Sequence, residues 1–110
     1  MPCKPIIILE GKYFNIAQCM GCKRIGLYYK NLLVSFDPQD FRAFSRSFSK
    51  INFKTSAVVF PDGFKHIVMD TCHQDIQINF IEEEFEEFKD ILQQAMIILE
   101  AHRIVNHPRN

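Results

Sequence analysis

The feature that most constrains this fold is a strand pattern followed at once by a helix pattern, which occurs twice. In residues 32–48 apolar side chains alternate and then recur every three or four residues, and residues 76–92 repeat this order 44 positions later. Three of the seventeen aligned pairs match Phe with Phe, where 11 Phe in 110 residues would give about one such pair per hundred. They are Phe36–Phe80, Phe41–Phe85 and Phe44–Phe88. The match predicts related half-repeats over residues 1–50 and 51–110; alternatively, two unrelated strand–helix junctions have the same packing needs.

Each pattern ends in a predicted amphipathic helix. The first covers residues 38–50 and begins at Asp37-Pro38, where an N-cap oxygen precedes a proline at the first helical position. The second runs from about residue 82 to about residue 104 and ends in His102-Arg103, as the helix dipole favours. The acidic run 82–87 is interpreted as a solvated helix start rather than as a carboxylate metal site.

Alternating apolar residues and turn signals predict seven short strands. The expected strands are residues 4–9, 12–18, 24–29 and 32–36 in one group, and 55–60, 65–70 and 76–80 in another. Their turns are marked by Glu10-Gly11, Lys30-Asn31 and Pro61-Asp62-Gly63. With 110 residues, of which 47% are hydrophobic, the chain can bury one core without disulfides. We therefore expect a single α+β domain over residues 1–110, with two groups of antiparallel strands, two helices and a cysteine turn at one end.

The stretch Cys19-Met20-Gly21-Cys22 carries the clearest chemistry in the sequence. Two thiols two residues apart on a tight turn can bind one metal ion or form one reversible disulfide. If Glu10-Gly11 is a two-residue turn, Cys3 lies opposite Gln18, beside this turn. Its side chain would point to the wrong face, which a single β-bulge would correct. Cys3 is therefore the expected third sulfur of a zinc site.

The fourth ligand of a tetrahedral zinc site stays open. Cys72 would complete a four-thiolate site, and His73 or His66 a site with three thiolates and one histidine. The 44-residue correspondence maps Cys72-His73 onto residues 28–29, at the far end of the strand that leaves Cys22. This position counts against Cys72 unless the two halves meet there. His102, His107 and a second subunit are more distant donors. The predicted metal residues are thus Cys3, Cys19, Cys22, Cys72 and His73.

The function expected from these residues is a non-enzymatic binding or regulatory protein with a structural zinc ion. One alternative is a thiol-redox protein, but the cysteine pair lies between strands and lacks the helix N-terminus that usually lowers a thiol pKa. A second alternative is a zinc-ribbon-like module that stacks Tyr28 and Tyr29 on single-stranded nucleic acid. A net charge of zero makes nucleic acid an unlikely partner.

Charge is unevenly distributed along the chain. Residues 1–31 hold five basic groups and one acidic group, whereas residues 80–110 hold three basic and seven acidic groups. This asymmetry predicts a basic sheet edge and an acidic helix face, or alternatively a basic patch beside the cysteine pair that binds an anion. The second helix is apolar on more than one side, which favours a homodimer through it. Without a signal peptide or a membrane-length apolar run, we expect a cytoplasmic protein with reduced thiols or metal ligands.

The order of these parts resembles a small uncharacterised protein family known mainly from Bacteroidetes-type bacteria. The matching features are Cys3, the Gly11 turn, Cys19-x-x-Cys22, the Asn31 turn, Leu32-x-Val34 and Asp40-Phe41-x-x-Phe44. The resemblance covers nearly the whole chain and implies no known activity. It implies at most that the three N-terminal cysteines act together.

Overall fold

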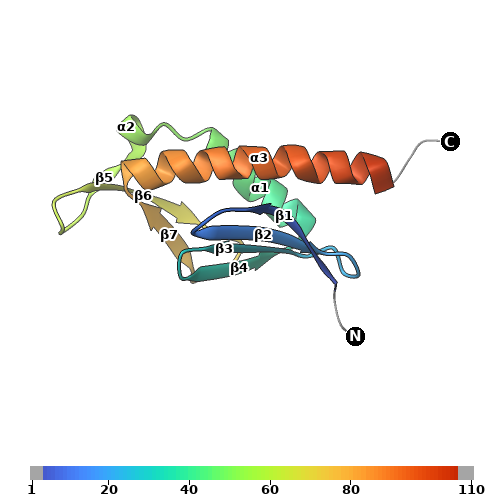
Figure 1. The fold of residues 1–110 in the computed structure, drawn as a ribbon. Helices are drawn as coiled ribbons and strands as arrows, with labels where there is room; N and C mark the ends of the chain where they lie inside the picture. Colours follow the sequence, from blue (N-terminus) through green and yellow to red (C-terminus); the bar gives the residue numbers. More distant parts are fainter. Residues whose placement is uncertain (1–3, 107–110) are drawn as a thin grey trace.

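The fold is α+β, with two antiparallel sheets and three helices (Figure 1). The computed structural model describes residues 4–106, and side chains up to residue 104. One sheet has the order β1-β2-β3-β4 and the other β5-β6-β7, as the two predicted strand groups require. The elements are β1 (Pro5–Glu10), β2 (Phe14–Cys19), β3 (Ile25–Tyr29), β4 (Leu32–Phe36), α1 (Pro38–Ser49), α2 (Phe53–Ser56), β5 (Val58–Val59), β6 (Lys65–Asp70), β7 (Gln77–Phe80) and α3 (Glu82–Asn106).

The helices α1 and α3 cover the same face of the four-stranded sheet. Figure 1 shows α3 running along the length of the molecule, with α1 behind it. The long helix contacts α1 as well as β1, β6 and β7. It is therefore buried on more than one side within a single chain, which accounts for much of its wide apolar surface.

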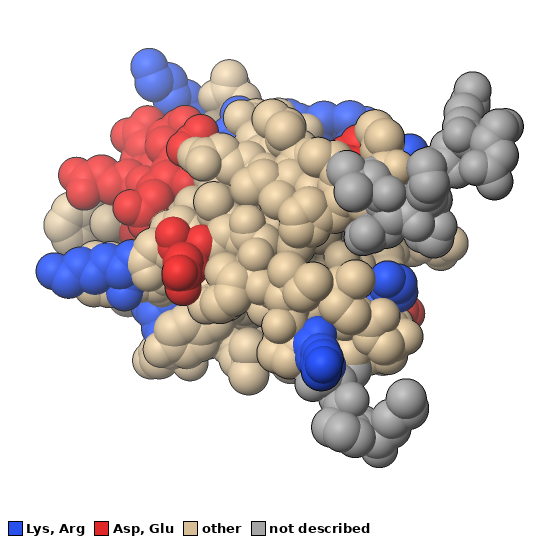
Figure 2. Space-filling view, turned by 45° about the vertical axis from the view of Figure 1, so that its right-hand side comes forward, with Lys and Arg blue, Asp and Glu red and all other residues tan. Residues whose placement is uncertain are grey.

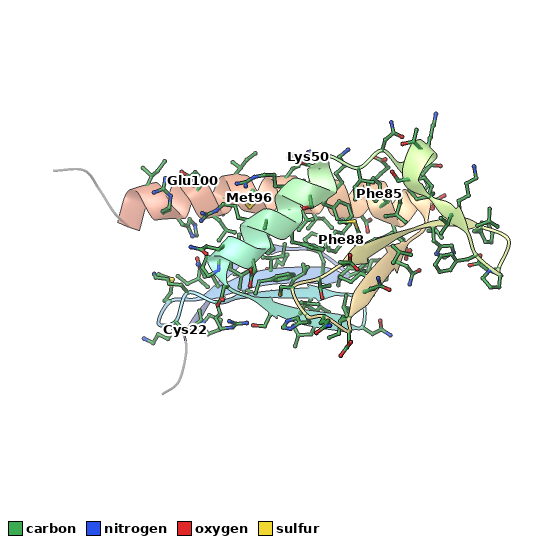
Figure 3. All side chains as sticks on the ribbon, turned by 180° about the vertical axis from the view of Figure 1, so that it is seen from behind. Cys22, Lys50, Phe85, Phe88, Met96 and Glu100 are labelled. Carbon is green, nitrogen blue, oxygen red and sulfur yellow. The ribbon has the colours of Figure 1, made fainter. Side chains whose placement is uncertain are left out.

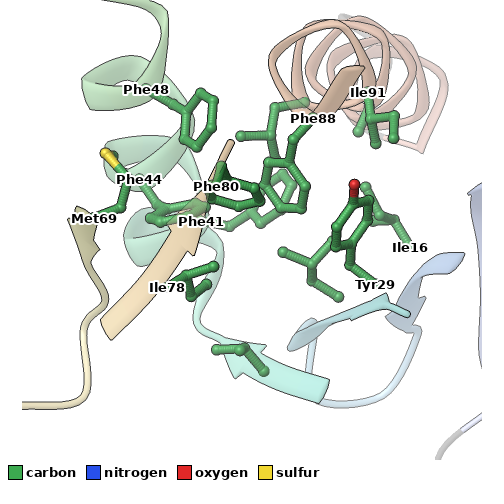
Figure 4. Packing of buried hydrophobic residues seen from close by; sticks show 14 of the residues in the cluster. Ile16, Tyr29, Phe41, Phe44, Phe48, Met69, Ile78, Phe80, Phe88 and Ile91 are labelled. Carbon is green, nitrogen blue, oxygen red and sulfur yellow. The ribbon is translucent and has the colours of Figure 1, made fainter. Parts of the chain in front are cut away.

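Aromatic rings from both halves of the chain form the centre of the core. Phe36, Phe41, Phe48, Phe80, Phe85 and Phe88 are all at most 1% exposed. Phe48 of α1 stacks on Phe85 of α3 with ring centroids 4.8 Å apart, and Phe88 meets Tyr29 edge-on at 4.9 Å. Figure 4 shows these rings converging from α1, β3, β7 and α3. Burying one such ring stabilises the fold by about 1.5–3 kcal/mol, so this cluster joins the two sheets into one core.

The predicted two-residue turn at Glu10-Gly11 is wrong. Glu10 pairs with Asn15, so residues 11–14 form a longer loop that is closed by the Gly11 N–H and the Phe14 carbonyl at 2.9 Å. A Cβ on Gly11 would lie only 2.3 Å from the Phe14 ring, so glycine lets this ring fold over the loop. The longer loop shifts the register of the whole hairpin.

The shifted register changes what faces the cysteine turn. Pro5 pairs with Cys19, and Gln18 pairs with Ile6 rather than with Cys3. A β-bulge does occur, between Ile7 and Leu9, within the strand rather than at its end. Cys3 itself lies outside the described residues.

Two further local predictions are also wrong. Residues 55–60 were expected as a strand, but the chain forms the short helix α2 and then the two-residue strand β5. Asn52 caps α2 by accepting a hydrogen bond from the Lys54 N–H at 3.0 Å, so there are three helices rather than two. The β3–β4 turn falls at Lys30-Asn31 as predicted, because Tyr29 pairs with Leu32, and Lys30 has a positive φ of 56°.

Candidate binding site at the cysteine end of the sheet

The turn between β2 and β3 holds Cys19 and Cys22 in a defined geometry. The Lys23 N–H donates to the Cys19 carbonyl at 2.8 Å, and Lys23 has a positive φ of 67°. The Cys22 N–H points at Cys19 Sγ from 3.4 Å. This contact holds the Cys19 sulfur, which is disulfide-bonded, against the backbone of the turn.

The start of β1 lies beside this turn. The Met20 N–H donates to the Lys4 carbonyl at 3.0 Å. Cys19 is disulfide-bonded, which differs from the expected reduced thiol or metal ligand. Among residues 4–106, no three His, Cys, Asp or Glu side chains are placed to hold a metal ion together.

Cys72 and His73 lie at the same end of the four-stranded sheet but at its opposite edge. His73 Nε2 is 3.2 Å from the carbonyl of Ser35 on β4, whereas Cys19 is on β2. The two halves therefore meet at this end, contrary to the position that the 44-residue correspondence indicated. Cys72 is an exposed free thiol; burial raises its pKa, and nearby Asp40 raises it further. This environment disfavours the thiolate that a metal needs.

His66 is held within the smaller sheet. Its Nε2 is 2.7 Å from Asp62 Oδ2, its Nδ1 is 2.9 Å from Asn79 Oδ1, and its ring stacks on Phe60 at 4.0 Å. Burial lowers the pKa of His66, but the hydrogen bonds to Asp62 and Asn79 outweigh it, so the net pKa is raised. These contacts satisfy both ring nitrogens, so His66 has a structural role in the β5–β6 hairpin.

A small pocket lies beside the cysteine turn, between that turn, the start of α1 and the last turns of α3. Its volume is about 220 Å³. Figure 3 shows Met96 and Glu100 on the part of α3 that borders it, with Cys22 below at the end of the sheet. The pocket is lined by Gln18, Lys23, Ile25, Pro38, Phe41, Arg42, Met96, Leu99, Glu100, His102 and Arg103.

The pocket combines an apolar wall with an excess of positive charge. Phe41 and Ile25 are buried, and Met96 and Leu99 are half-buried. Three cationic residues, Lys23, Arg42 and Arg103, face a single acidic one, Glu100. Arg103 is paired with Glu100 at 2.5 Å. Within residues 4–104, no ion pair joins Lys23 or Arg42 to an acidic side chain. The pKa of Glu100 is lowered mainly by its hydrogen bond to Arg103 and also by the charge of Arg42, so the three cations share one carboxylate.

The start of α1 carries two carboxylates, Asp37 at the N-cap position and Asp40 in the first turn. The Asp37 side chain makes no cap hydrogen bond and instead accepts from Arg24 at 2.6 Å. The first turn of α1 therefore lacks a side-chain cap, and its acidic groups offset the positive end of the helix dipole.

The sequence predicts only part of this site. It indicates a basic patch beside the cysteine pair as one of two alternatives, and it indicates His102 only as a distant metal ligand. The pocket was missed because its wall comes from three segments far apart in the chain. A detectable signal was Met96 and Leu99 beside the charged residues 100 and 103, near the end of the long helix.

The fold and site define a small α+β protein with an amphipathic pocket beside a cysteine turn. The chain belongs to DUF6686, a family of unknown function, whose model matches residues 1–105. Comparison with curated proteins and with solved structures finds no match. In the described part of the chain, no helix has the length and apolar character needed to cross a membrane.

Proposed function

We propose that this protein is a small non-enzymatic binding module and that its ligand binds in the pocket beside the cysteine turn. The observation that supports this most is the combination of a buried apolar wall with Lys23 and Arg42, which lack ion-pair partners among the described residues. Ligand sites are typically concave and mostly apolar, with a few polar groups that fix orientation. Pockets for drug-sized ligands measure about 300–1,000 Å³, so a pocket of about 220 Å³ fits a smaller molecule.

A fragment screen by ¹H–¹⁵N correlation NMR tests this proposal. Small fragments of mixed polarity should shift the backbone amides of Ile25, Phe41 and Leu99, which border the pocket. Ala substitution of Met96 should weaken these shifts, whereas Ala substitution of the exposed Phe64, in the loop just before β6, should not. Fragments that bind only elsewhere, or not at all, would contradict the proposed site.

The cysteine turn has a second proposed role as a zinc site of the reduced protein. Cys3, Cys19 and Cys22 would supply three thiolates. The Cys22 N–H directed at Cys19 Sγ and the Lys4–Met20 hydrogen bond support this ligand set. The disulfide at Cys19 favours thiol-redox chemistry instead, because a disulfide sulfur cannot supply a thiolate.

Metal analysis of protein purified under reducing conditions separates the two roles. The zinc proposal expects about one zinc per chain, lost in the Cys22→Ser variant and retained in Cys72→Ser, since Cys72 lies at the other edge of the sheet. Absence of zinc from fully reduced protein would contradict the zinc role and leave thiol-redox chemistry. The fragment screen does not depend on this result.

A homodimer through the long helix also stays a prediction. Ile97 of α3 is 71% exposed and Ile104 is 59% exposed, so part of the apolar surface of α3 is uncovered in the single chain. Sedimentation equilibrium should then show a dimer that Ile97→Glu converts to a monomer. A wild-type monomer at high concentration would contradict the prediction.

A further inference from the structure

We propose that the pocket is selective for a small organic anion with an unbranched apolar chain, such as a short fatty carboxylate. This inference rests on the proposed binding function and adds the chemical class of the ligand. It does not depend on whether the cysteine turn holds zinc.

The anionic group is inferred from the cations at the rim of the pocket. Lys23 and Arg42 come from different elements, the β2–β3 turn and α1, and both line the same space. Neither has an ion-pair partner in the described chain, whereas Arg103 is already bound by Glu100 through two hydrogen bonds. An arginine side chain binds a carboxylate with two parallel hydrogen bonds. The free positive charge of the pocket is thus placed to bind one acidic group.

The apolar chain is inferred from the apolar residues that line the pocket. Phe41 and Ile25 are at most 2% exposed, so the accessible apolar surface comes mainly from the half-buried Met96 and Leu99, and Met96 can adapt its shape to a flexible chain. The limited volume of about 220 Å³ favours a short chain over a long one. Each buried CH₂ group should raise the affinity about fourfold until the pocket is full.

Isothermal titration calorimetry on the full chain, purified without reductant so that the disulfide at Cys19 is retained, tests the ligand class with three probes of equal chain length. Sodium octanoate should bind with one molecule per chain, and octan-1-ol and octylamine at least tenfold more weakly. Hexanoate should bind more tightly than butanoate by roughly fifteenfold, from two CH₂ groups. Octan-1-ol binding as tightly as octanoate would overturn the anion preference while leaving the proposed binding function intact.

Charge variants then locate the carboxylate. Arg42→Gln should weaken octanoate binding about tenfold or more and leave octan-1-ol binding unchanged, and Lys23→Gln should have a smaller effect of the same kind. The matched control is Arg46→Gln, one helical turn further along α1 and outside the lining of this pocket. Equal affinities of wild type, Arg42→Gln and Lys23→Gln for octanoate would overturn the inference. Binding of no fragment at all would instead contradict the proposed function.

Discussion

The starts of α1 and α3 share an apolar pattern but differ in how their polar groups are used. The two helices begin 44 residues apart, and each follows a strand that ends in a buried phenylalanine, Phe36 or Phe80. At α3, Glu84 Oε1 accepts from the Ile81 N–H at 3.2 Å, and its Oε2 accepts from Lys30 at 2.5 Å. At α1, the N-cap carboxylate leaves the helix uncapped. At the start of α3, a side chain of the helix itself caps the backbone and forms an ion pair, and we call this the closed end of the molecule. At the start of α1, the N-cap side chain makes no cap hydrogen bond, and we call this the open end.

Packing and binding depend on different residues of the same strand–helix pattern. Phenylalanines in equivalent positions build the core in both halves. The polar residues beside them determine whether the backbone N–H groups of each helix start are capped by the protein's own side chains. Figure 2 shows acidic side chains gathered over the start of α3, where Glu82, Glu83 and Glu84 form its first turn. Tyr29 donates to Glu87 at 3.1 Å, and burial raises the pKa of Tyr29 well above its usual range, so it stays a donor.

The largest expected effect comes from the shared core. Phe88→Ala should lower the free energy of unfolding by about 3–5 kcal/mol, because it removes a fully buried ring and leaves a cavity. The equivalent Phe44→Ala should cost less, because Phe44 is 6% exposed and Phe88 is fully buried between Phe48 and Phe80. Urea denaturation measures both.

The exposed Phe64 provides the control for these core substitutions. Phe64→Ala should change the stability by no more than about 0.5 kcal/mol, since this side chain is 64% exposed. A Phe88→Ala loss as small as that of Phe64→Ala would mean that the two halves do not share one core.

A smaller effect distinguishes the two helix starts directly. Glu84→Gln should lower the stability by about 1–2 kcal/mol, because it weakens both a cap and a half-buried ion pair. Asp37→Asn should cost about 0.5 kcal/mol or less, since Asp37 caps nothing and its pair with Arg24 is exposed. Thermal unfolding at low salt compares the two variants. Equal losses would remove the distinction between a closed and an open end.

The closed end should also respond to acid. Burial raises the pKa of Glu84, but Lys30 and the Ile81 N–H outweigh it, so the folded-state pKa lies below the ordinary value. Its stabilisation is therefore present above the unfolded pKa and is lost as pH falls through the folded pKa. Stability measured from pH 6 down to pH 2 should fall less steeply in Glu84→Gln than in wild type. Parallel curves would show that Glu84 makes no such contribution.

The smallest effect concerns His66, which lies near enough to the start of α3 for the charge of Glu84 to contribute to its raised pKa. Because its folded-state pKa is raised, the pairing with Asp62 stabilises the protein fully below the unfolded pKa and is lost as pH rises through the folded pKa. Asp62→Asn should therefore flatten the pH dependence of stability on the alkaline side of pH 6. An unchanged profile would show that the pair contributes nothing measurable.

Much of the fold could be predicted because its periodicities are strong. The strands 32–36 and 65–70 and the starts of both long helices agree with the structure to the residue, since Asp37-Pro38 and the alternation of apolar side chains are local signals. Local reasoning failed where a side chain acts across a turn. The Phe14 ring folds over Gly11 and lengthens that loop, and Asn52 caps a helix where β-branched residues indicated a strand.

The pocket and the position of Cys72 could not be predicted for a different reason. Both depend on how the two halves of the chain meet, which no local pattern encodes. The charges of Lys23 and Arg42 are visible in the sequence. That they form no ion pair within residues 4–104, while Arg24 and Arg103 do, is a property of the packed fold. The open end of the molecule was therefore recognisable only as a basic region.

The most direct test of the open-end account is a ¹H–¹⁵N correlation titration with sodium octanoate of protein that retains the disulfide at Cys19. The account predicts saturable shifts centred on the amides of Lys23, Arg42 and Leu99, with Lys30 and Glu84 unchanged. Shifts centred on Lys30 and Glu84, or no saturable shift at millimolar octanoate, would contradict it.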